Sequence, residues 1–206
     1  MKALVLSEHG DLDKLGLVKD KPVPQPGDGE VLVRVGASSF NYHDIFTVRG
    51  MPGIRVPLPV VIGLDIAGTV VEDAGEWKAG DRVMVNPLRA GIGLMGEMVD
   101  GGMEEYVVVS ADQLFRIPDN VSFHQAAALP VAYGTAHRML ITHNTVRPGD
   151  RVLILGASGG VGTASIIIAK MLGAEVIACG GSDEKCARLK ELGADYTINY
   201  NTTDFV

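Results

Sequence analysis

Apolar residues in the first 120 positions fall into short runs separated by glycine and proline turns. Runs of this length and residue type are typical of β-strands, and Gly and Pro are the usual residues of the turns between them. The predicted strands are Met1 to Leu6, Val31 to Ala37, Ala67 to Glu72, Arg82 to Val85 and Tyr106 to Val109. This part of the chain is therefore predicted to form a β-rich barrel or sandwich.

From about Ser122 the pattern changes to helical stretches that alternate with apolar strands. A helical stretch runs toward Leu140, and a continuous apolar run, Val152 to Leu155, is predicted to be a strand covered on both faces. The elements expected after it are helix Gly160 to Leu172, strand Glu175 to Cys179, helix Asp183 to Leu192 and strand Tyr196 to Asn199. This order predicts half of a doubly wound parallel sheet. We therefore expect two domains, residues 1–122 and 123–206.

A glycine-rich turn, GASGGVG at Gly156 to Gly162, joins the first of these strands to its helix. In that context, free amides at the start of the helix donate to the pyrophosphate of a dinucleotide. Gly159 would let the backbone approach the pyrophosphate and Gly162 would let the helix pack close to the strand, while Ala157 replaces the first glycine of the usual fingerprint. The predicted cofactor contacts in the turn are Ser158, Gly159, Gly160, Val161 and Gly162. The alternative is a glycine-rich turn that serves packing alone.

The residues that follow the second strand of this sheet predict a preference for NADPH over NADH. An acidic residue at that place binds the ribose hydroxyls of NADH and repels a 2′-phosphate, but the strand runs into CGGSDEK without one. Gly180 leaves room for the phosphate, and Ser182 and Lys185 can donate to it. Gly181, Ser182 and Lys185 are therefore predicted cofactor contacts. The acids Asp183 and Glu184 are interpreted as first-turn residues that complement a helix dipole.

Composition narrows the class of protein. With 206 residues, 47% hydrophobic, and no apolar run long enough for a bilayer, the chain is expected to be globular, without a membrane as partner. A net charge of −7 and the lack of a basic cluster disfavour nucleic acid as partner. Two cysteines and an N-terminus without signal-peptide features predict a cytoplasmic setting.

Segments spread over nearly the whole chain resemble the medium-chain dehydrogenase/reductase superfamily, within it the NADPH-dependent quinone oxidoreductase-like and enoyl reductase branch. They are PVPQPGDGEVLVRV, SFNYHDIFTVRG, VIGLDIAGTV, KAGDRV, GGMEEYVVV, RPGDRVLILGASGGVG and SDEKCARLKELGADYTINY. The resemblance implies a GroES-like β domain, a Rossmann domain, an active site in the cleft between them, and a homodimer. Proteins of this family continue through three more Rossmann strands, so we expect this chain to be a fragment or the ordered part of a longer protein with a truncated Rossmann sheet.

The resemblance also provides a test for zinc. Aligned by the flanking motifs, the positions of the catalytic zinc ligands in related alcohol dehydrogenases hold Asn41, Leu64 and Val131, and residues 87–100 contain no cysteine for a structural zinc. Zinc takes thiolate, imidazole or carboxylate ligands. His43 and Asp65 lie beside two of these positions, but a structural histidine and a partly buried carboxylate are the favoured interpretation. We expect no metal site.

The resemblance further implies roles for individual residues. Asn41 would orient the nicotinamide or the substrate oxygen, Thr135 would lie beside the nicotinamide, and Tyr200 with Lys185 would hold the adenosine phosphate. Tyr42, a candidate catalytic residue, and Asp44 are alternatives for the proton donor or a substrate contact, with water as a third source of the proton. Each of these residues also has a purely structural interpretation. Asn41 would be a turn or core hydrogen-bonding residue, Thr135 a helix residue bonded to its own backbone, and Tyr200 an aromatic residue at a strand end.

Without a metal to polarise a carbonyl, hydride addition suits an acceptor that is already electron-poor. The predicted function is therefore NADPH-dependent, zinc-independent reduction of a small electrophile, an activated alkene or a quinone. Two alternatives stay open: a non-catalytic nucleotide-binding module, including one that binds RNA, and a relative of the zinc-type alcohol dehydrogenases.

Overall fold

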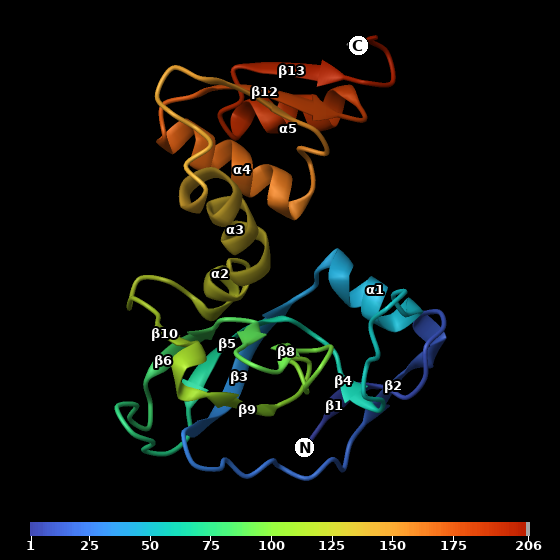
Figure 1. Ribbon diagram of the computed structural model, residues 1–206, viewed down its shortest axis with the longest axis vertical. Coiled ribbons are helices and arrows are strands. Elements are labelled where there is room, and N and C mark those ends of the chain that lie inside the picture. Colours follow the sequence, from blue (N-terminus) through green and yellow to red (C-terminus); the bar gives the residue numbers. More distant parts are fainter. Residues whose placement is uncertain (205–206) are drawn as a thin grey trace. The chain divides into compact units, whose positions relative to one another are not determined.

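The structure is a computed structural model in which residues 1–204 are described, and the chain divides into two units, 1–131 and 132–206 (Figure 1). The first unit holds antiparallel sheets and the second a parallel sheet with helices. The predicted fold class, a GroES-like β domain followed by part of a Rossmann sheet, is confirmed.

A five-stranded antiparallel sheet forms the centre of the first unit. Its order is β10 (Leu114–Arg116), β6 (Arg82–Val85), β5 (Asp65–Val70), β3 (Glu30–Ser39) and β9 (Tyr106–Ser110). Alternate residues of β3, Val31 and Val33, are buried with Ile66 in the core of the unit. The pairing of β3 with β5 shifts register between Val35 and Ala37. A bulge of this kind bends the sheet locally.

Smaller elements complete the first unit. A three-stranded sheet has the order β2 (Leu15–Val18), β1 (Ala3–Leu6) and β4 (Val60–Val61), and a short hairpin pairs β7 (Leu88–Arg89) with β8 (Gly93–Leu94). The short 3-10 helices are η1 (Leu12–Lys14) and η2 (Ala111–Gln113). The strand at the N-terminus packs through Leu6 against Val48 and Ile62.

Two short α-helices belong to the first unit as well. Helix α1 (Tyr42–Arg49) begins after Asn41, whose backbone N donates to Asp44 Oδ2 at 2.7 Å. Helix α2 (Phe123–Ala127) begins after Ser122 in a capping box with Gln125. The alanines near its end are buried against the sheet. This packing explains why the division into units falls after Val131, later in the chain than the division after 122 that the change of pattern suggested.

The second unit contains the predicted alternation of strands and helices. Helix α3 (Pro130–His137) runs into the π-helical turn η3 (Arg138–Thr142). The elements after it are β11 (Arg151–Ile154), α4 (Gly160–Met171), β12 (Glu175–Gly180), α5 (Asp183–Glu191) and β13 (Tyr196–Asn199). The strands form a parallel sheet in the order β11-β12-β13. Both helices are followed by a glycine at positive φ, Gly173 at 81° and Gly193 at 110°, as expected for a helix stop.

The prediction that the strand at Val152 to Leu155 is covered on both faces is wrong. Ile154 is buried, but Leu153 is 51% exposed and Leu155 is 65% exposed. Leu153 and Leu155 are alternate residues and therefore point to the same face of the sheet, and that face is left open among residues 1–204. The apolar run is therefore covered on one face only.

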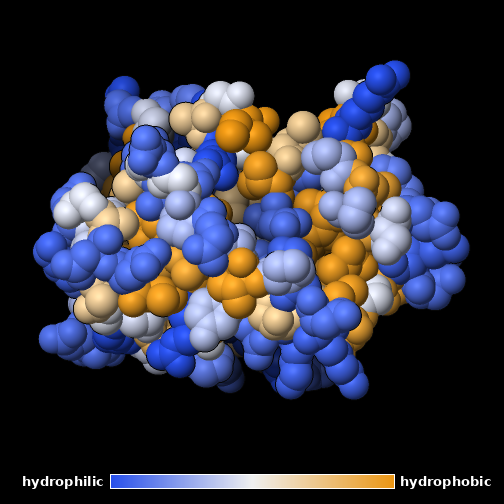
Figure 2. Space-filling view, turned by 90° about the horizontal axis from the view of Figure 1, so that it is seen from below, coloured by the Kyte–Doolittle hydropathy of each residue, from blue (hydrophilic) through white to orange (hydrophobic). Residues whose placement is uncertain are grey.

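The surface of the described residues shows no membrane-spanning element. Among residues 1–204, no helix combines the length and the apolar character that crossing a bilayer requires. On the face drawn in Figure 2, apolar patches are interspersed with hydrophilic side chains. Exposed apolar side chains distributed in this way are common on folded proteins.

Candidate functional site

The glycine-rich turn places unpaired backbone donors at the start of α4. Gly159 is the residue before the helix, and its N donates to Gly156 O at 3.0 Å, while Ala157 N donates to Cys179 O at 3.2 Å. Within residues 1–204, no protein acceptor is bound by the amides of Ser158, Gly160, Val161 and Gly162. Free amides at a helix N-terminus, together with the positive end of the helix dipole, form a site for an anion such as a phosphate.

The glycines of this turn are required for two different reasons. A Cβ at Gly162 would lie 2.5 Å from Gly156 O and 2.6 Å from Ala157 Cα, so the helix could not pack on the turn with any larger residue. A Cβ at Gly159 would meet only Gly156 O, at 3.4 Å, and one at Gly160 would meet only Ala132 Cβ, at 3.4 Å. Packing within the protein therefore explains Gly162, but it does not require glycine at 159 or 160.

The same turn lines a pocket of about 560 Å³ in the second unit. The lining residues are Met139, Leu140, Val152, Leu153, Ile154, Leu155, Gly156, Gly159, Gly160, Val161, Gly162 and Ser165. Apolar side chains form most of the wall and the glycine backbone supplies the polar groups. This combination is typical of small-molecule sites, in which a few polar groups orient the ligand.

The predicted adenosine-phosphate residues lie together at the carboxyl end of β12. A Cβ at Gly181 would be 2.5 Å from Tyr200 Oη, so the phenol of Tyr200 lies directly against that glycine. Ser182 caps α5, its Oγ accepting from Lys185 N at 3.2 Å. The ammonium group of Lys185 is exposed and forms no ion pair within the described part of the chain.

The neighbouring acids are already engaged by protein groups. Asp183 Oδ1 accepts from Asn199 Nδ2 at 2.7 Å, and Glu184 Oε1 pairs with Arg188 Nη2 at 3.0 Å. Asp183 and Glu184 lie in the first turn of α5, the place that the sequence analysis gave them. The cation of Lys185 is therefore available to an anionic ligand.

In the first unit, the buried carboxylate of Asp65 joins three segments. Its Oδ2 accepts from Ser39 Oγ at 2.8 Å and from Asn41 Nδ2 at 2.9 Å, and its Oδ1 accepts from Val131 N at 2.9 Å. Asp65 is 1% exposed, more deeply buried than expected, and burial raises the pKa of its carboxyl although the hydrogen bonds oppose this.

Two of the three positions that the family resemblance aligns with zinc ligands, Asn41 and Val131, meet at Asp65 through an amide and a backbone N–H. The third, Leu64, is buried and apolar. In residues 1–204 no group of three His, Cys, Asp or Glu side chains is arranged to hold a metal. The donors present at these positions do not suit zinc, which takes thiolate, imidazole or carboxylate ligands.

The remaining predicted site residues differ in accessibility. Tyr42 is 71% exposed, and its ring packs edge-on against Phe46 with centroids 5.1 Å apart. Thr135 is exposed on α3 in the second unit. Asp44 is buried, its pKa is raised by burial, and its Oδ2 is used by the cap of α1. Asp44 Oδ1 is buried without a hydrogen-bond partner among residues 1–204, and a role for Asp44 as proton donor stays a prediction.

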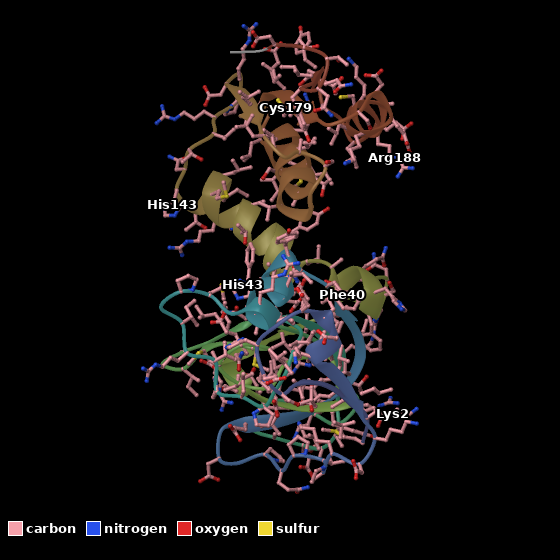
Figure 3. The ribbon with its side chains drawn as sticks, turned by 90° about the vertical axis from the view of Figure 1, so that its right-hand side faces the viewer. Lys2, Phe40, His43, His143, Cys179 and Arg188 are labelled. Carbon is pink, nitrogen blue, oxygen red and sulfur yellow. The ribbon has the colours of Figure 1, made fainter. Side chains whose placement is uncertain are left out.

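Sequence reasoning missed a contact between His43 and Glu97. His43 Nε2 and Glu97 Oε2 are 2.6 Å apart, and His43 lies in the first turn of α1 (Figure 3). Glu97 is 54 positions away along the chain, between β8 and β9, outside any regular element. No spacing or periodicity connects the two, although a polar residue in an otherwise apolar glycine-rich segment, GLMGEMV, is a weak signal for it.

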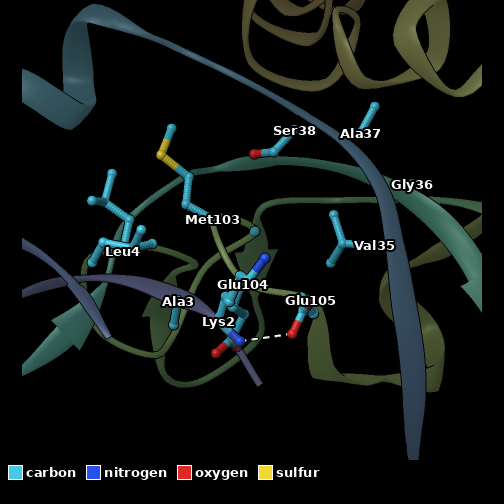
Figure 4. A pocket seen from close by; sticks show the side chains of 12 residues that line it. Lys2, Ala3, Leu4, Val35, Gly36, Ala37, Ser38, Met103, Glu104 and Glu105 are labelled. Carbon is cyan, nitrogen blue, oxygen red and sulfur yellow. Dashed lines mark hydrogen bonds between the residues drawn. The ribbon is translucent and has the colours of Figure 1, made fainter. Parts of the chain in front are cut away.

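A second polar cluster lies beside a pocket at the N-terminal strand. Lys21 Nζ contacts Glu104 Oε2 at 2.5 Å and Asp100 Oδ2 at 2.9 Å. The backbone N of Lys2 donates to Glu105 Oε2 at 2.7 Å (Figure 4). Burial raises the pKa of Glu104 to about 7. These contacts hold the N-terminal segment against the segment that precedes β9.

Comparisons with known proteins agree with this architecture. The family described as "Alcohol dehydrogenase GroES-like domain" matches residues 27–119, and that described as "Zinc-binding dehydrogenase" matches residues 160–206. The synaptic vesicle membrane protein VAT-1 homolog of Mus musculus is 37% identical, over 100% of this chain and 49% of its own length. The quinone oxidoreductase of Homo sapiens is 31% identical, over 100% of this chain and 60% of its own length.

A crystal structure of an NAD-dependent alcohol dehydrogenase is similar with a TM-score of 0.92 and 38% identity, covering 99% of this chain and 65% of that one. The chain spans about half the length of the VAT-1 homologs that it matches. Both domain types, in the same order, are thus shared with these proteins. The resemblance noted in the sequence is confirmed: the chain belongs to the medium-chain dehydrogenase/reductase superfamily, in its quinone oxidoreductase-like branch.

Proposed function

We propose that this protein is an NADPH-dependent oxidoreductase that reduces a small electrophile, an activated alkene or a quinone, without a catalytic zinc ion. The proposal depends on the backbone of the turn before α4. Its amides lack protein acceptors, and packing does not require glycine at position 159. A ligand that must approach the backbone closely explains both features.

The residues present fit a nicotinamide dinucleotide. The amides of Ser158 and Gly160 to Gly162 would donate to its pyrophosphate, and Gly159 would leave room for the oxygens. The exposed Lys185 and the phenol of Tyr200 beside Gly181 would hold a 2′-phosphate, which supports NADPH over NADH. When bound, the dihydronicotinamide supplies a hydride.

The donor groups around Asp65 support a reaction without zinc. Asn41, Leu64 and Val131 offer an amide, an aliphatic chain and a backbone N–H where a zinc site needs anionic or imidazole ligands. Reduction of an unactivated carbonyl would lack its Lewis acid, whereas an electron-poor alkene or quinone accepts a hydride without one.

We assign Asn41 and Thr135 to contacts with the nicotinamide or the substrate oxygen, and Tyr42 to a contact with the substrate. Asn41 is held by its bond to Asp65, so its amide has a fixed orientation. Tyr42 presents an exposed ring. We also expect a homodimer and a cytoplasmic location, as family resemblance and composition respectively suggest.

Oxidation of NADPH in the presence of a quinone or a 2-enoyl thioester tests this function, with the zinc content of the same sample measured by mass spectrometry. We expect turnover with substoichiometric zinc and no effect of a chelator. Turnover that requires zinc, an alcohol and NAD would instead support a zinc-type dehydrogenase. Cofactor binding without turnover of any acceptor would support a non-catalytic module.

A further inference from the structure

The contact between His43 and Glu97 has the features of a proton-transfer pair. The Nε2 to Oε2 distance of 2.6 Å is short for a hydrogen bond between a nitrogen and an oxygen. The Glu97 side chain is 7% exposed, and His43 is its single hydrogen-bond partner among residues 1–204. A buried carboxylate that accepts from one ring nitrogen fixes the orientation and the tautomer of an imidazole.

The other ring nitrogen of His43 is free to act. Nδ1 has no hydrogen-bond partner in the described residues, and the His43 side chain is 26% exposed. His43 thus has one ring nitrogen held by Glu97 and the other available to solvent or to a ligand.

The position of the pair on the chain connects it with the candidate active site. His43 follows Asn41 and Tyr42 directly and lies in the first turn of the helix that Asn41 caps. Asn41 is in turn bonded to Asp65. The imidazole therefore stands on the same short, well-anchored segment as the residues to which we assign substrate and nicotinamide contacts.

We propose that His43 is the acid that protonates the reduced substrate, with Glu97 as its positioning residue; this proposal rests on the proposed function. Addition of the hydride at the β-carbon of an enoyl substrate moves the alkene electron pair toward the carbonyl oxygen and gives an enolate. As the carbonyl re-forms, the α-carbon takes the proton of His43 Nδ1, whose N–H electron pair stays on the ring. Solvent then returns a proton to the neutral imidazole, so the cycle consumes one hydride and one proton for each alkene.

The stereochemistry of protonation tests this role. We would reduce an α-methyl 2-enoyl thioester with NADPH in D₂O and determine the configuration at the α-carbon of the product. Wild-type protein is expected to give one configuration. His43→Gln, whose amide can still donate to Glu97, is expected to give both configurations and to lower kcat by about 10²-fold, the usual contribution of a general acid. Glu97→Ala is expected to lower kcat without changing KM and to reduce the preference.

Two controls separate this role from structure and from the proposed function. His124→Gln, at an exposed position of α2, should leave rate and configuration unchanged. NADPH affinity of His43→Gln, measured by fluorescence, should equal that of the wild type.

The outcomes distinguish the two proposals. Wild-type protein that oxidises no NADPH with any acceptor would overturn the proposed function, and the role of His43 with it. Wild-type turnover together with an unchanged rate and a single product configuration in His43→Gln would overturn the role of His43 alone.

Discussion

The glycines of the dinucleotide turn show how much the meaning of one residue depends on its surroundings. The motif in the sequence suggests cofactor binding for all of them, but the structure separates Gly162, which packing requires, from Gly159, which packing does not. The sequence could predict the turn because strand, glycines and helix follow one another within a few positions. It could not predict which glycine serves the fold, because the atoms that exclude a Cβ are known only once the backbone is built.

This separation predicts opposite effects for two matched substitutions. Gly162→Ala places a methyl group against backbone atoms and should destabilise the protein by about 1–3 kcal/mol, as overpacking does. Gly159→Ala should leave the free energy of unfolding nearly unchanged but weaken NADPH binding at least about tenfold, or about 1.4 kcal/mol. Urea unfolding and fluorescence titration measure the two quantities. Equal effects of the two variants on stability would contradict the distinction.

The expected preference for NADPH depends on the charge of one side chain, that of Lys185. Lys185→Ala should weaken NADPH binding by about 1.5–3 kcal/mol, the worth of a charged hydrogen bond, and leave NADH binding unchanged. Arg188→Ala removes the same charge from the same helix, where Arg188 forms an exposed pair with Glu184, and serves as the control. Parallel titrations with both cofactors measure the effect. A Lys185→Ala variant that keeps its NADPH affinity would refute the assignment of the 2′-phosphate site.

At the scale of elements, sequence patterns succeeded where local signals mark both ends of an element. Helix α5 was predicted as Asp183 to Leu192, closed by Gly193, and the structure has it at Asp183–Glu191 with Ser182 as its cap. Helix α1 was missed because its buried residues include the polar Asp44 and Thr47, which hides the apolar periodicity. The two-residue strands β4, β7 and β8 are too short for any period, and the contact between α1 and Glu97 depends on tertiary structure alone.

The joining of elements at Asp65 can be tested by removing its carboxylate. Asp65→Ala removes the acceptor of Asn41 Nδ2 and of Val131 N and one of the two acceptors of Ser39 Oγ, and each buried donor left unsatisfied costs about 1–3 kcal/mol. We expect a loss of about 3 kcal/mol or more in urea unfolding. The control is the exposed Asp119, whose replacement by Ala should change stability little. A loss no larger in Asp65→Ala than in the control would show that the three bonds do not hold the elements together.

At the scale of the whole molecule, the buried Glu104 links stability to pH. Burial raises the pKa of Glu104 to about 7 from a reference of 4.5, so between these values the folded chain holds a proton that the unfolded chain has released. The stability that this proton contributes is present below about pH 4.5 and is lost as pH rises through about 7; it amounts to about 3 kcal/mol at most.

Unfolding free energies at pH 5 and pH 8 measure this contribution. Glu104→Gln should reduce the difference between the two pH values by up to about 3 kcal/mol. The neighbouring, exposed Glu105 provides the control, since Glu105→Gln should keep the wild-type difference. A pH dependence that is the same in wild type and Glu104→Gln would show that this carboxyl is ionised in the folded protein at neutral pH.

The central claim is that the turn before α4 binds the pyrophosphate of a dinucleotide, and backbone amide resonances test it most directly. Titration of the ¹⁵N-labelled protein with NADPH should shift the amide signals of Ser158, Gly160, Val161 and Gly162 saturably, together with those of Gly181 and Lys185. Amides at these positions that do not move while NADPH is present in saturating excess, or shifts confined to other parts of the protein, would contradict it.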